Sequence, residues 1–510
     1  MRLEPREMPS WPPLAWLARC GTKSVELLHG SMVEVGEGWA CEGGWAGAFG
    51  PGGFDRAAVV AGSGARIRDG EAIFVPPTST LDRLCSLADG DGRMLVSNSL
   101  IAPLAVSGAE LPKRRPRTYK AALASISRGL EHRRGAIPTS VGPLRLTYFH
   151  NLVWNGRTLE LRRKPSIEVA LPDFHAYRDF LAGGFASLAA NLVDAGRRTP
   201  LRFLGTLSSG YDGNACTALA AEVGCADALC FETNTRGHPD SGVPIAEALG
   251  ITPIVVERDA WRHQPERDFF PEVPFLAVGS GGGLVGFYGA HERLRGAVLV
   301  TGFYGDSIWN PAWQHLGPEI VRKDASGLAF CEYRLYAGFI NCPATFWAAR
   351  EVAEVVRIAR SEEMAPWMAG AEYQRPVPRR ILEDAGVARE LFGQRKSGVP
   401  RATPHREGEF LRPASQRDYF AWLRRNKAAL GAPRTIVSPR LDRLRLRWND
   451  ALLRAHAWSR RLPGWGASQA WQRRRQKLRR RTRRPSSMRR HTVWWALERA
   501  GEAYVSPPQS

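Results

Sequence analysis

Small residues and an aspartate follow an apolar segment near the centre of the chain. Residues 205–214 read GTLSSGYDGN, and the apolar segment 201–207 predicts a buried strand. Residues 216–223, CTALAAEV, then predict a helix. A strand, a tight turn and a helix N-terminus present backbone N–H groups and the positive end of a helix dipole to an anion. We therefore expect a nucleotide phosphate to bind at this turn, with Asp212 as a ligand for Mg²⁺.

A second aspartate, Asp306, ends a similar run, because residues 298–307 read VLVTGFYGDS. Apolar strands are predicted at residues 201–207, 228–231, 253–256 and 297–301, and helices at 174–195, 214–223 and 241–249. This alternation predicts an α/β fold with a parallel sheet flanked by helices. Ligands of such sheets bind at the carboxyl ends of the strands. We therefore expect the three loops at residues 208–213, 234–240 and 302–306, which carry Asp212, Asp240 and Asp306, to line one crevice.

These segments resemble the asparagine-synthetase-like ATP pyrophosphatases, whose PP-loop (pyrophosphatase loop) reads Ser-Gly-Gly-x-Asp-Ser. Residues 208–213, SSGYDG, stand in its place, and residues 298–307 resemble the family's second aspartate loop. Residues 392–398, FGQRKSG, resemble a later segment whose lysine faces pyrophosphate. The resemblance covers roughly residues 175–400. It implies a PP-loop fold, of the adenine nucleotide alpha hydrolase-like kind, that uses ATP and Mg²⁺.

The resemblance also assigns roles to single residues. It implies that Asp212 and Asp306 hold Mg²⁺ and that Lys396 stabilises the departing pyrophosphate. The residues expected to surround the nucleotide are Ser208, Ser209, Gly210, Tyr211, Asp212, Gly213 and Gly302. We expect the ring of Tyr211, like that of Phe303, to pack rather than to stack on a base.

The chain departs from the family pattern at several positions. Ser209 replaces a glycine and Gly213 replaces the final serine, while Phe303 and Ser307 stand where relatives carry acids. Glutamine-dependent members have a cysteine directly after the initiator Met; here residue 2 is Arg, so that glutaminase cannot operate. We interpret residues 1–165 as an α+β domain and a degenerate remnant of the glutaminase.

Two other patterns favour simpler interpretations. Residues 281–286, GGGLVG, fit Gly-x-Gly-x-x-Gly, with Asp306 twenty residues beyond. The segment before them is short and closely preceded by prolines, so we interpret them as a loop beside the nucleotide. Asp240 precedes a predicted helix, and we expect it to cap that helix.

The basic charge is concentrated near the C-terminus. The formal net charge is +21, and residues 434–490 alone hold nineteen Lys or Arg against two acids. Leu441, Leu444 and Trp448 have helical spacing among arginines. We predict an ATP-binding domain over 166–432 and a helical tail over 433–510. The tail suits nucleic acid or an anionic membrane surface as a partner, or is a solvated appendage.

Together these features predict an ATP- and Mg²⁺-dependent ligase that forms an amide through an acyl-adenylate. Its substrates would be a small-molecule carboxylate and an amine or ammonia. The alternatives are a catalytically degenerate nucleotide-binding module and a PP-loop enzyme acting on RNA. The chain has no signal-like N-terminus, no long apolar run and no paired cysteine pattern, so we expect it in the cytoplasm.

Overall fold

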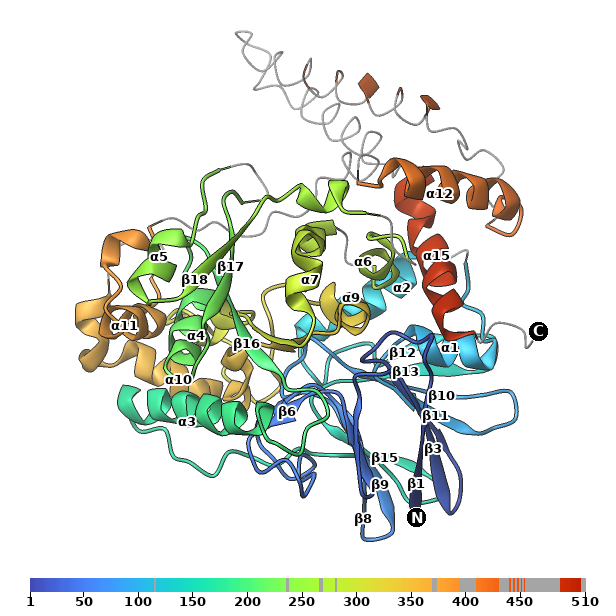
Figure 1. Ribbon diagram of the computed structural model, residues 1–510, viewed down its shortest axis with the longest axis horizontal. Coiled ribbons are helices and arrows are strands. Elements are labelled where there is room, and N and C mark those ends of the chain that lie inside the picture. The colour runs from blue at the N-terminus through green and yellow to red at the C-terminus, as the bar shows by residue number, and fades with distance from the viewer. Residues whose placement is uncertain are drawn as a thin grey trace, which may run out of the picture.

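The structure is a computed structural model. It describes residues 1–113, 116–234, 238–265, 269–279, 282–368, 374–394, 410–430 and 487–505, together with seven single residues: Arg440, Leu441, Leu444, Arg447, Trp448, Ala451 and Arg454. Figure 1 shows the chain from its blue N-terminal strands to its red C-terminal helix.

A parallel sheet forms the centre of the α/β part. Its strands are β16 (Arg202–Leu207), β17 (Asp227–Phe231), β18 (Thr252–Val256), β19 (Ala297–Val300) and β20 (Ile340–Cys342). They lie in the order β18-β17-β16-β19-β20, and every neighbouring pair is parallel. In register, Gly205 pairs with Ala228 on one side of β16, and Phe203 pairs with Val298 on the other. The predicted α/β fold with a parallel sheet is confirmed.

Helices cover both faces of this sheet (Figure 1). One face packs against α3 (Phe174–Leu192), α4 (Asp212–Ala221), α5 (Val243–Ala248), α10 (Val352–Arg360) and α11 (Pro376–Asp384). The other packs against η2 (Ala260–His263), α6 (Val273–Ala277), η3 (Gly282–Ala290), α7 (His291–Leu294) and α9 (Phe330–Ala337). Alternate residues of β16 show this division, since Phe203 belongs to the first core and Leu204 to the second. The inner positions of the strands are apolar because both faces of the sheet are covered, whereas Arg202 at the start of β16 and Val255 of the edge strand β18 are exposed.

The N-terminal part consists of two packed sheets. The first runs β1-β3-β2-β11-β10-β13-β12, with β1 (Arg2–Glu7), β2 (Trp16–Cys20), β3 (Ser24–His29), β10 (Leu84–Ala88), β11 (Met94–Ser97), β12 (Ala136–Pro138) and β13 (Pro143–Thr147). The second runs β15-β14-β9-β8-β5-β4, with β4 (Glu34–Gly36), β5 (Trp39–Cys41), β8 (Gly64–Arg68), β9 (Glu71–Val75), β14 (Asn151–Trp154) and β15 (Leu159–Arg162). A short pair, β6 (Gly44–Trp45) and β7 (Val60–Ala61), completes this part.

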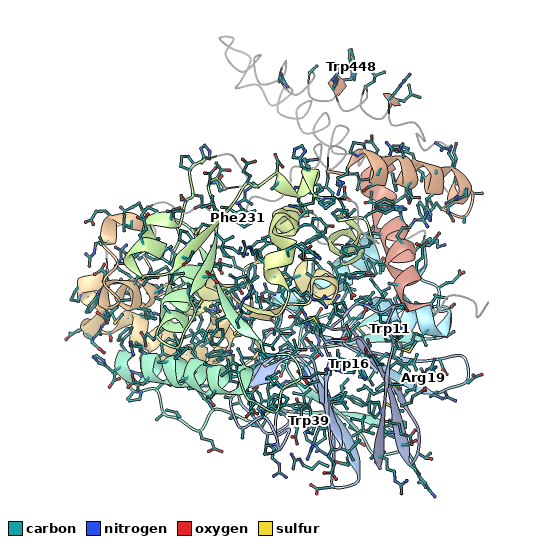
Figure 2. All side chains as sticks on the ribbon, in the orientation of Figure 1. Trp11, Trp16, Arg19, Trp39, Phe231 and Trp448 are labelled. Atoms are coloured by element: carbon teal, nitrogen blue, oxygen red, sulfur yellow. The ribbon has the colours of Figure 1, made fainter. Side chains whose placement is uncertain are left out.

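A shared apolar core joins the two N-terminal sheets. Trp16 of β2 stacks on Phe74 of β9, with ring centroids 6.2 Å apart. Figure 2 labels Trp16 and Trp39 inside this part of the molecule. The helices α1 (Ile101–Ser107) and α2 (Pro116–Ala124) and the turn η1 (Ser125–Arg128) lie beside the first sheet.

Buried charges connect the N-terminal sheets to helix α9. Arg334 donates from Nη1 and Nη2 to the two carboxylate oxygens of Glu42, at 2.8 and 2.9 Å, and from Nε to Asp82 at 2.9 Å. All three side chains are nearly inaccessible to solvent. Removing one partner would leave an uncompensated buried charge, so this cluster fixes the sheets against the α/β part.

The end of the chain returns to the body of the molecule. Helices α12 (Pro413–Asn426) and α15 (Ser487–Gly501) pack together, and η10 (Glu502–Tyr504) follows. Asp418 of α12 accepts hydrogen bonds from Trp495 at 2.6 Å and from both Nε and Nη2 of Arg499 at 2.8 Å. Residues 487–505 of the predicted tail are therefore docked.

The remaining short helices lie around the second aspartate and the region that follows it. They are α8 (Gly305–Ile308), η4 (Ala344–Phe346), η5 (Ala349–Glu351), η6 (Glu362–Trp367) and η7 (Arg389–Leu391). Among the helices that the structure describes, none is long and apolar enough to cross a bilayer.

Candidate functional site

The two predicted aspartates follow adjacent strands at the point where the order of the sheet reverses. The chain leaves β16 toward β17 and β18 on one side, while β19 and β20 lie on the other. Loops after β16 and β19 therefore diverge, and crevices at such switch points are where open α/β sheets bind ligands. Residues 208–213 follow β16 and residues 301–306 follow β19.

Glycines bring these two loops into direct contact. A Cβ atom on Gly302 would lie 2.2 Å from the carbonyl carbon of Asp212, and one on Gly305 would lie 2.6 Å from Asp212 Cγ. No side chain fits in those gaps, so both positions need glycine for close approach. The side chain of Asp212 thus lies against the backbone that leads directly into Asp306.

Hydrogen bonds within the protein already hold the first part of the loop after β16. The N–H of Ser208 donates to Asn214 Oδ1 at 3.0 Å, and the N–H of Gly210 to Ser208 Oγ at 3.2 Å. Ser209 donates to Asp240 Oδ1 from its N–H at 3.2 Å and from its hydroxyl at 2.5 Å. Three of the N–H groups expected to cradle phosphate therefore have acceptors in the chain.

Asp240 does not cap a helix as we expected. Helix α5 begins after Gly242, and no side chain caps it. Asp240 instead reaches back to Ser209, so it fixes the shape of the loop. Burial raises the pKa of Asp240, and the hydrogen bonds from Ser209 oppose that increase.

Because the N–H groups of Ser208, Ser209 and Gly210 already have acceptors, the first turn of helix α4 is the remaining candidate for contact with phosphate. The helix begins at Asp212, and the leading N–H groups of an α-helix have no acceptor within the helix. Asp212 and Gly213 stand at this end, where the helix dipole favours negative charge. An anion here would face both the helix end and the loop that carries Gly302.

Tyr211 stabilises the loop after β16 by packing against helix α11 and the ring of Phe392. Its side chain is 1% exposed and its hydroxyl accepts a hydrogen bond from Arg379 of α11. Phe392 packs edge-on against the ring, and the N–H of Gly393 donates to the carbonyl of Ser209 at 2.9 Å. The prediction that Tyr211 packs is confirmed. Lys396 lies outside the described residues, since this described stretch ends at Gln394, two positions after Phe392.

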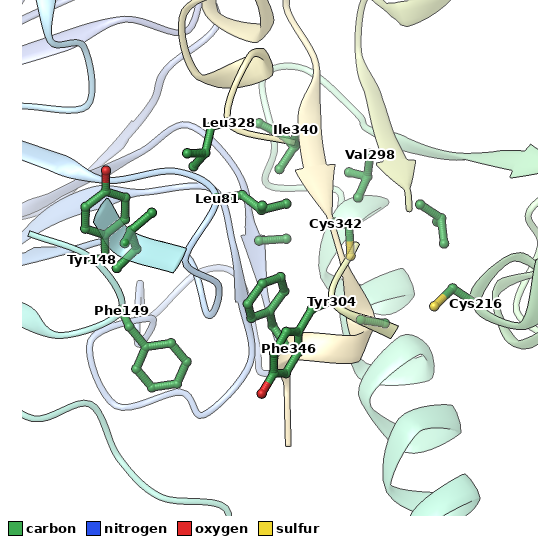
Figure 3. Packing of buried hydrophobic residues seen from close by; sticks show 14 of the residues in the cluster. Leu81, Tyr148, Phe149, Cys216, Val298, Tyr304, Leu328, Ile340, Cys342 and Phe346 are labelled. Atoms are coloured by element: carbon green, nitrogen blue, oxygen red, sulfur yellow. The ribbon is translucent and has the colours of Figure 1, made fainter. Parts of the chain in front are cut away.

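The second loop holds an unusual backbone conformation. Tyr304 has φ of 82°, a left-handed value that costs a non-glycine residue free energy. Its ring stacks on Phe346, with centroids 4.6 Å apart, and Figure 3 shows the two rings beside the end of β20. The carbonyl of Asp306 accepts a hydrogen bond from Arg375 Nη2 at 3.3 Å. Phe303 packs edge-on against Phe330, as expected.

The two aspartates of this site are suited to a metal ion that binds together with a phosphate-containing substrate. Among the described residues, no three His, Cys, Asp or Glu side chains form a metal-binding group. Mg²⁺ is commonly held by one or two carboxylates and by substrate phosphates, rather than by a complete protein cage. Asp212 and Asp306 are oxygen donors of the right kind for that mode.

Comparison with known proteins assigns no family. No family model matches the chain, and no curated protein sequence matches it.

Two residues at the site, Arg375 and Arg379, were not singled out from the sequence, because nothing distinguished them from the other arginines of the chain. Asp240 was predicted to line the crevice with its loop and to cap the following helix, but its contact with Ser209 was not predicted. The contacts that identify them join segments more than thirty residues apart. The place of Asp240 at this edge of the sheet could be predicted because its loop follows the second strand, β17.

Proposed function

We propose that this chain is an ATP-dependent ligase that forms an amide through an acyl-adenylate, as the PP-loop resemblance implies. One observation carries the proposal: Asp212 packs on the loop of Asp306 at the reversal point of a parallel sheet. Two carboxylates and a helix N-terminus at that point match the needs of a magnesium-bound triphosphate.

The chemistry proceeds in two transfers. An oxygen of the acceptor carboxylate attacks the α-phosphorus of ATP, the bond from that phosphorus to the bridging oxygen breaks, and pyrophosphate leaves. An amine or ammonia then attacks the acyl carbon, the C–O bond to AMP breaks, and the amine loses a proton. Negative charge builds on the leaving group in the first transfer, so cations and N–H donors are the principal catalytic requirement.

Residues of this chain supply those groups. Asp212 and Asp306 would hold Mg²⁺, which neutralises charge on phosphate oxygens. The first-turn N–H groups of α4 would bind the phosphates. Lys396 remains a prediction for the pyrophosphate contact, supported by the hydrogen bond that brings Gly393 to Ser209.

The N-terminal sheets would shape the acceptor side of the site, because the Arg334 cluster fixes them next to the α/β part. With Arg at residue 2, the nitrogen would come from free ammonia or from an amine on a second substrate.

A nucleotide-binding module without catalysis is the second candidate. It is favoured by the residues flanking Asp306, because Phe303 and Ser307 carry no charge. It is also favoured by the internal hydrogen bonds of Ser208 to Gly210, which leave fewer donors for phosphate.

Product analysis separates the two candidates. The full chain would be incubated with MgATP, an ammonium salt and pools of small carboxylates, and AMP and pyrophosphate would be measured. The ligase predicts equimolar AMP and pyrophosphate with at least one pool, lost in Asp306→Asn and retained in Asp324→Asn, a control at an exposed residue. Nucleotide binding without either product in any pool would favour the module.

A further inference from the structure

A second polar cluster lies where the N-terminal sheets meet the α/β part. Arg83 directly precedes β10, and Tyr148 directly follows β13. These strands are antiparallel, with Leu84 opposite Thr147, so Arg83 and Tyr148 are the next cross-strand pair. Figure 3 shows Tyr148 and Leu81 among the buried residues of the same cluster as the stacked Tyr304 and Phe346.

Several hydrogen-bonding atoms in this cluster are buried without a partner. Within the described part of the chain, Nε and Nη2 of Arg83, Nε of Arg133 and the hydroxyl of Tyr148 have no hydrogen-bond partner. The remaining nitrogen of Arg83, Nη1, donates to the sulfur of Cys331 at 3.5 Å, and the guanidinium also faces the Tyr148 hydroxyl and the Cys85 thiol. Buried polar groups in native proteins are nearly always satisfied, so such a group of orphaned donors needs a ligand.

The cluster holds more positive than negative charge. Glu332 is the buried carboxylate whose charge acts on Arg83, and its oxygens accept hydrogen bonds from the Ser99 hydroxyl and the N–H of Leu100. In the described ranges, neither Arg83 nor Arg133 forms an ion pair, and Arg322 donates only to the carbonyls of Thr80 and Ser326. Burial lowers the pKa of both Arg133 and Arg322. The phenol of Tyr148 favours the charged form of Arg133, and Asp324 and Asp306, followed by Tyr148, favour that of Arg322. By contrast, Arg334 is fully paired with Glu42 and Asp82.

The positive potential extends past Tyr148 to His150, whose Nδ1 has no hydrogen-bond partner among the described residues. Burial and neighbouring positive charges lower the pKa of His150 to about 4. Those charges belong to Arg350, Arg133, Arg163 and Lys164. Arg133 and Arg350 are half-buried, whereas Arg163 is exposed and burial lowers the pKa of Lys164 to about 7. Half-buried positive charges next to the buried Arg83 are costly unless an anion neutralises them.

We propose that Arg83, Arg133 and Tyr148 bind an oxyanion, a carboxylate or phosphate group, between the N-terminal sheets and the loop of Asp306. Guanidinium N–H groups and a phenol O–H are donors that match carboxylate and phosphate oxygens. Arg322 lies at the edge of the site toward Asp306, since the charges of both Tyr148 and Asp306 act on it. The inference does not depend on ligase activity, because the site is defined without a nucleotide.

Titration calorimetry on the full chain, without nucleotide, tests the site with inorganic phosphate and with citrate at constant ionic strength. We expect saturable binding of at least one probe, and the preference between them identifies the oxyanion. Arg133→Gln and Tyr148→Phe each remove a single donor and should weaken binding about tenfold or more. The control Arg157→Gln, at an exposed arginine on the β14–β15 turn, should bind as the unmodified chain does.

Two results would overturn the proposal. One is the absence of saturable binding by either probe. The other is binding that both variants retain at full strength, as phosphate bound at the loop after β16 would show. Tyr148→Phe preserves the buried ring, so its thermal unfolding should stay close to that of the unmodified chain and a loss of binding cannot be assigned to misfolding.

Discussion

The side chain of Asp212 lies against the backbone of Gly305, where an added Cβ atom would be 2.6 Å from Cγ and 2.9 Å from Oδ1. Gly305→Ala must therefore displace the carboxylate. We expect this variant to weaken binding of a non-hydrolysable MgATP analogue about tenfold or more, measured by titration calorimetry.

Gly50→Ala is the matched control for that substitution. A Cβ atom at Gly50 would have nothing within 4 Å, so this variant should bind the analogue normally. Equal affinity in Gly305→Ala and the unmodified chain would mean that the position of the Asp212 carboxylate does not matter for nucleotide binding.

We expect Asp240 to act by holding Ser209, and so the loop after β16, rather than by contacting the nucleotide. Asp240→Ala removes the acceptor of both hydrogen bonds from Ser209 and should lower the free energy of unfolding by about 1–3 kcal/mol, measured in urea. Affinity for the analogue should fall with it, because the loop loses its support. Asp240→Asn keeps an oxygen acceptor and should be closer to the unmodified chain; if it behaves like the alanine variant, the charge and not the hydrogen bond is what the loop requires.

Lys164 should make stability depend on pH. Its side chain is buried, Nζ donates to the carbonyl of Pro76 at 2.9 Å, and burial lowers its pKa to about 7. Between about pH 7 and its unfolded pKa of about 10.4, the unfolded chain binds more protons at this residue, so its contribution to stability rises with pH. The contribution of Lys164 to stability therefore decreases as the pH falls from about 10.4, and it is fully lost once the pH has fallen through about 7.

Urea unfolding from pH 6 to 9 in the unmodified chain and in Lys164→Met isolates that contribution. The buried cysteines have raised pKa values and act in the opposite direction at alkaline pH, but they are common to both proteins. The free energy of unfolding of the unmodified chain, minus that of the variant, should rise with pH above about 7. A difference that does not change with pH would contradict the buried, neutral lysine.

The arginine-rich segment should bind anionic membranes through an apolar stripe. Leu441, Leu444 and Trp448 are helical and 56–67% exposed, and Arg440 and Arg447 lie beside them. Figure 2 shows Trp448 away from the body of the molecule. Such a face suits a bilayer interface. Co-sedimentation with phosphatidylserine-containing vesicles should be several-fold weaker for Trp448→Ala and absent with neutral vesicles; binding to single-stranded RNA alone would instead support the nucleic-acid alternative.

The central sheet could be predicted closely from the sequence. Its first four strands are continuous apolar runs, and the observed bounds of β16, β17, β18 and β19 differ from the predicted ones by one residue at most. The fifth strand, Ile340–Cys342, was missed because three residues within a helical region carry no periodic signal. In the N-terminal part, short runs rich in apolar residues at 72–75, 94–96, 144–149 and 159–161 indicate β9, β11, β13 and β15, whereas β1 is exposed and charged and gives no apolar pattern.

The site was only partly predictable. Both aspartates could be located because each follows an apolar strand in a turn of small residues. The sequence could not show that Ser209 is bound by Asp240, or that Arg379 supports Tyr211, because those contacts depend on how distant segments pack. The orphaned donors of Arg83 and Tyr148 were likewise invisible, since a cross-strand pair is defined only by register.

Binding of a non-hydrolysable MgATP analogue to Asp212→Asn and Asp306→Asn tests most directly whether the two aspartates share one magnesium-bound nucleotide. The prediction is that each substitution weakens binding in the presence of Mg²⁺ by about tenfold or more, and that the effect shrinks when Mg²⁺ is removed by a chelator. Full affinity in both variants, or the same loss with and without Mg²⁺, would contradict it.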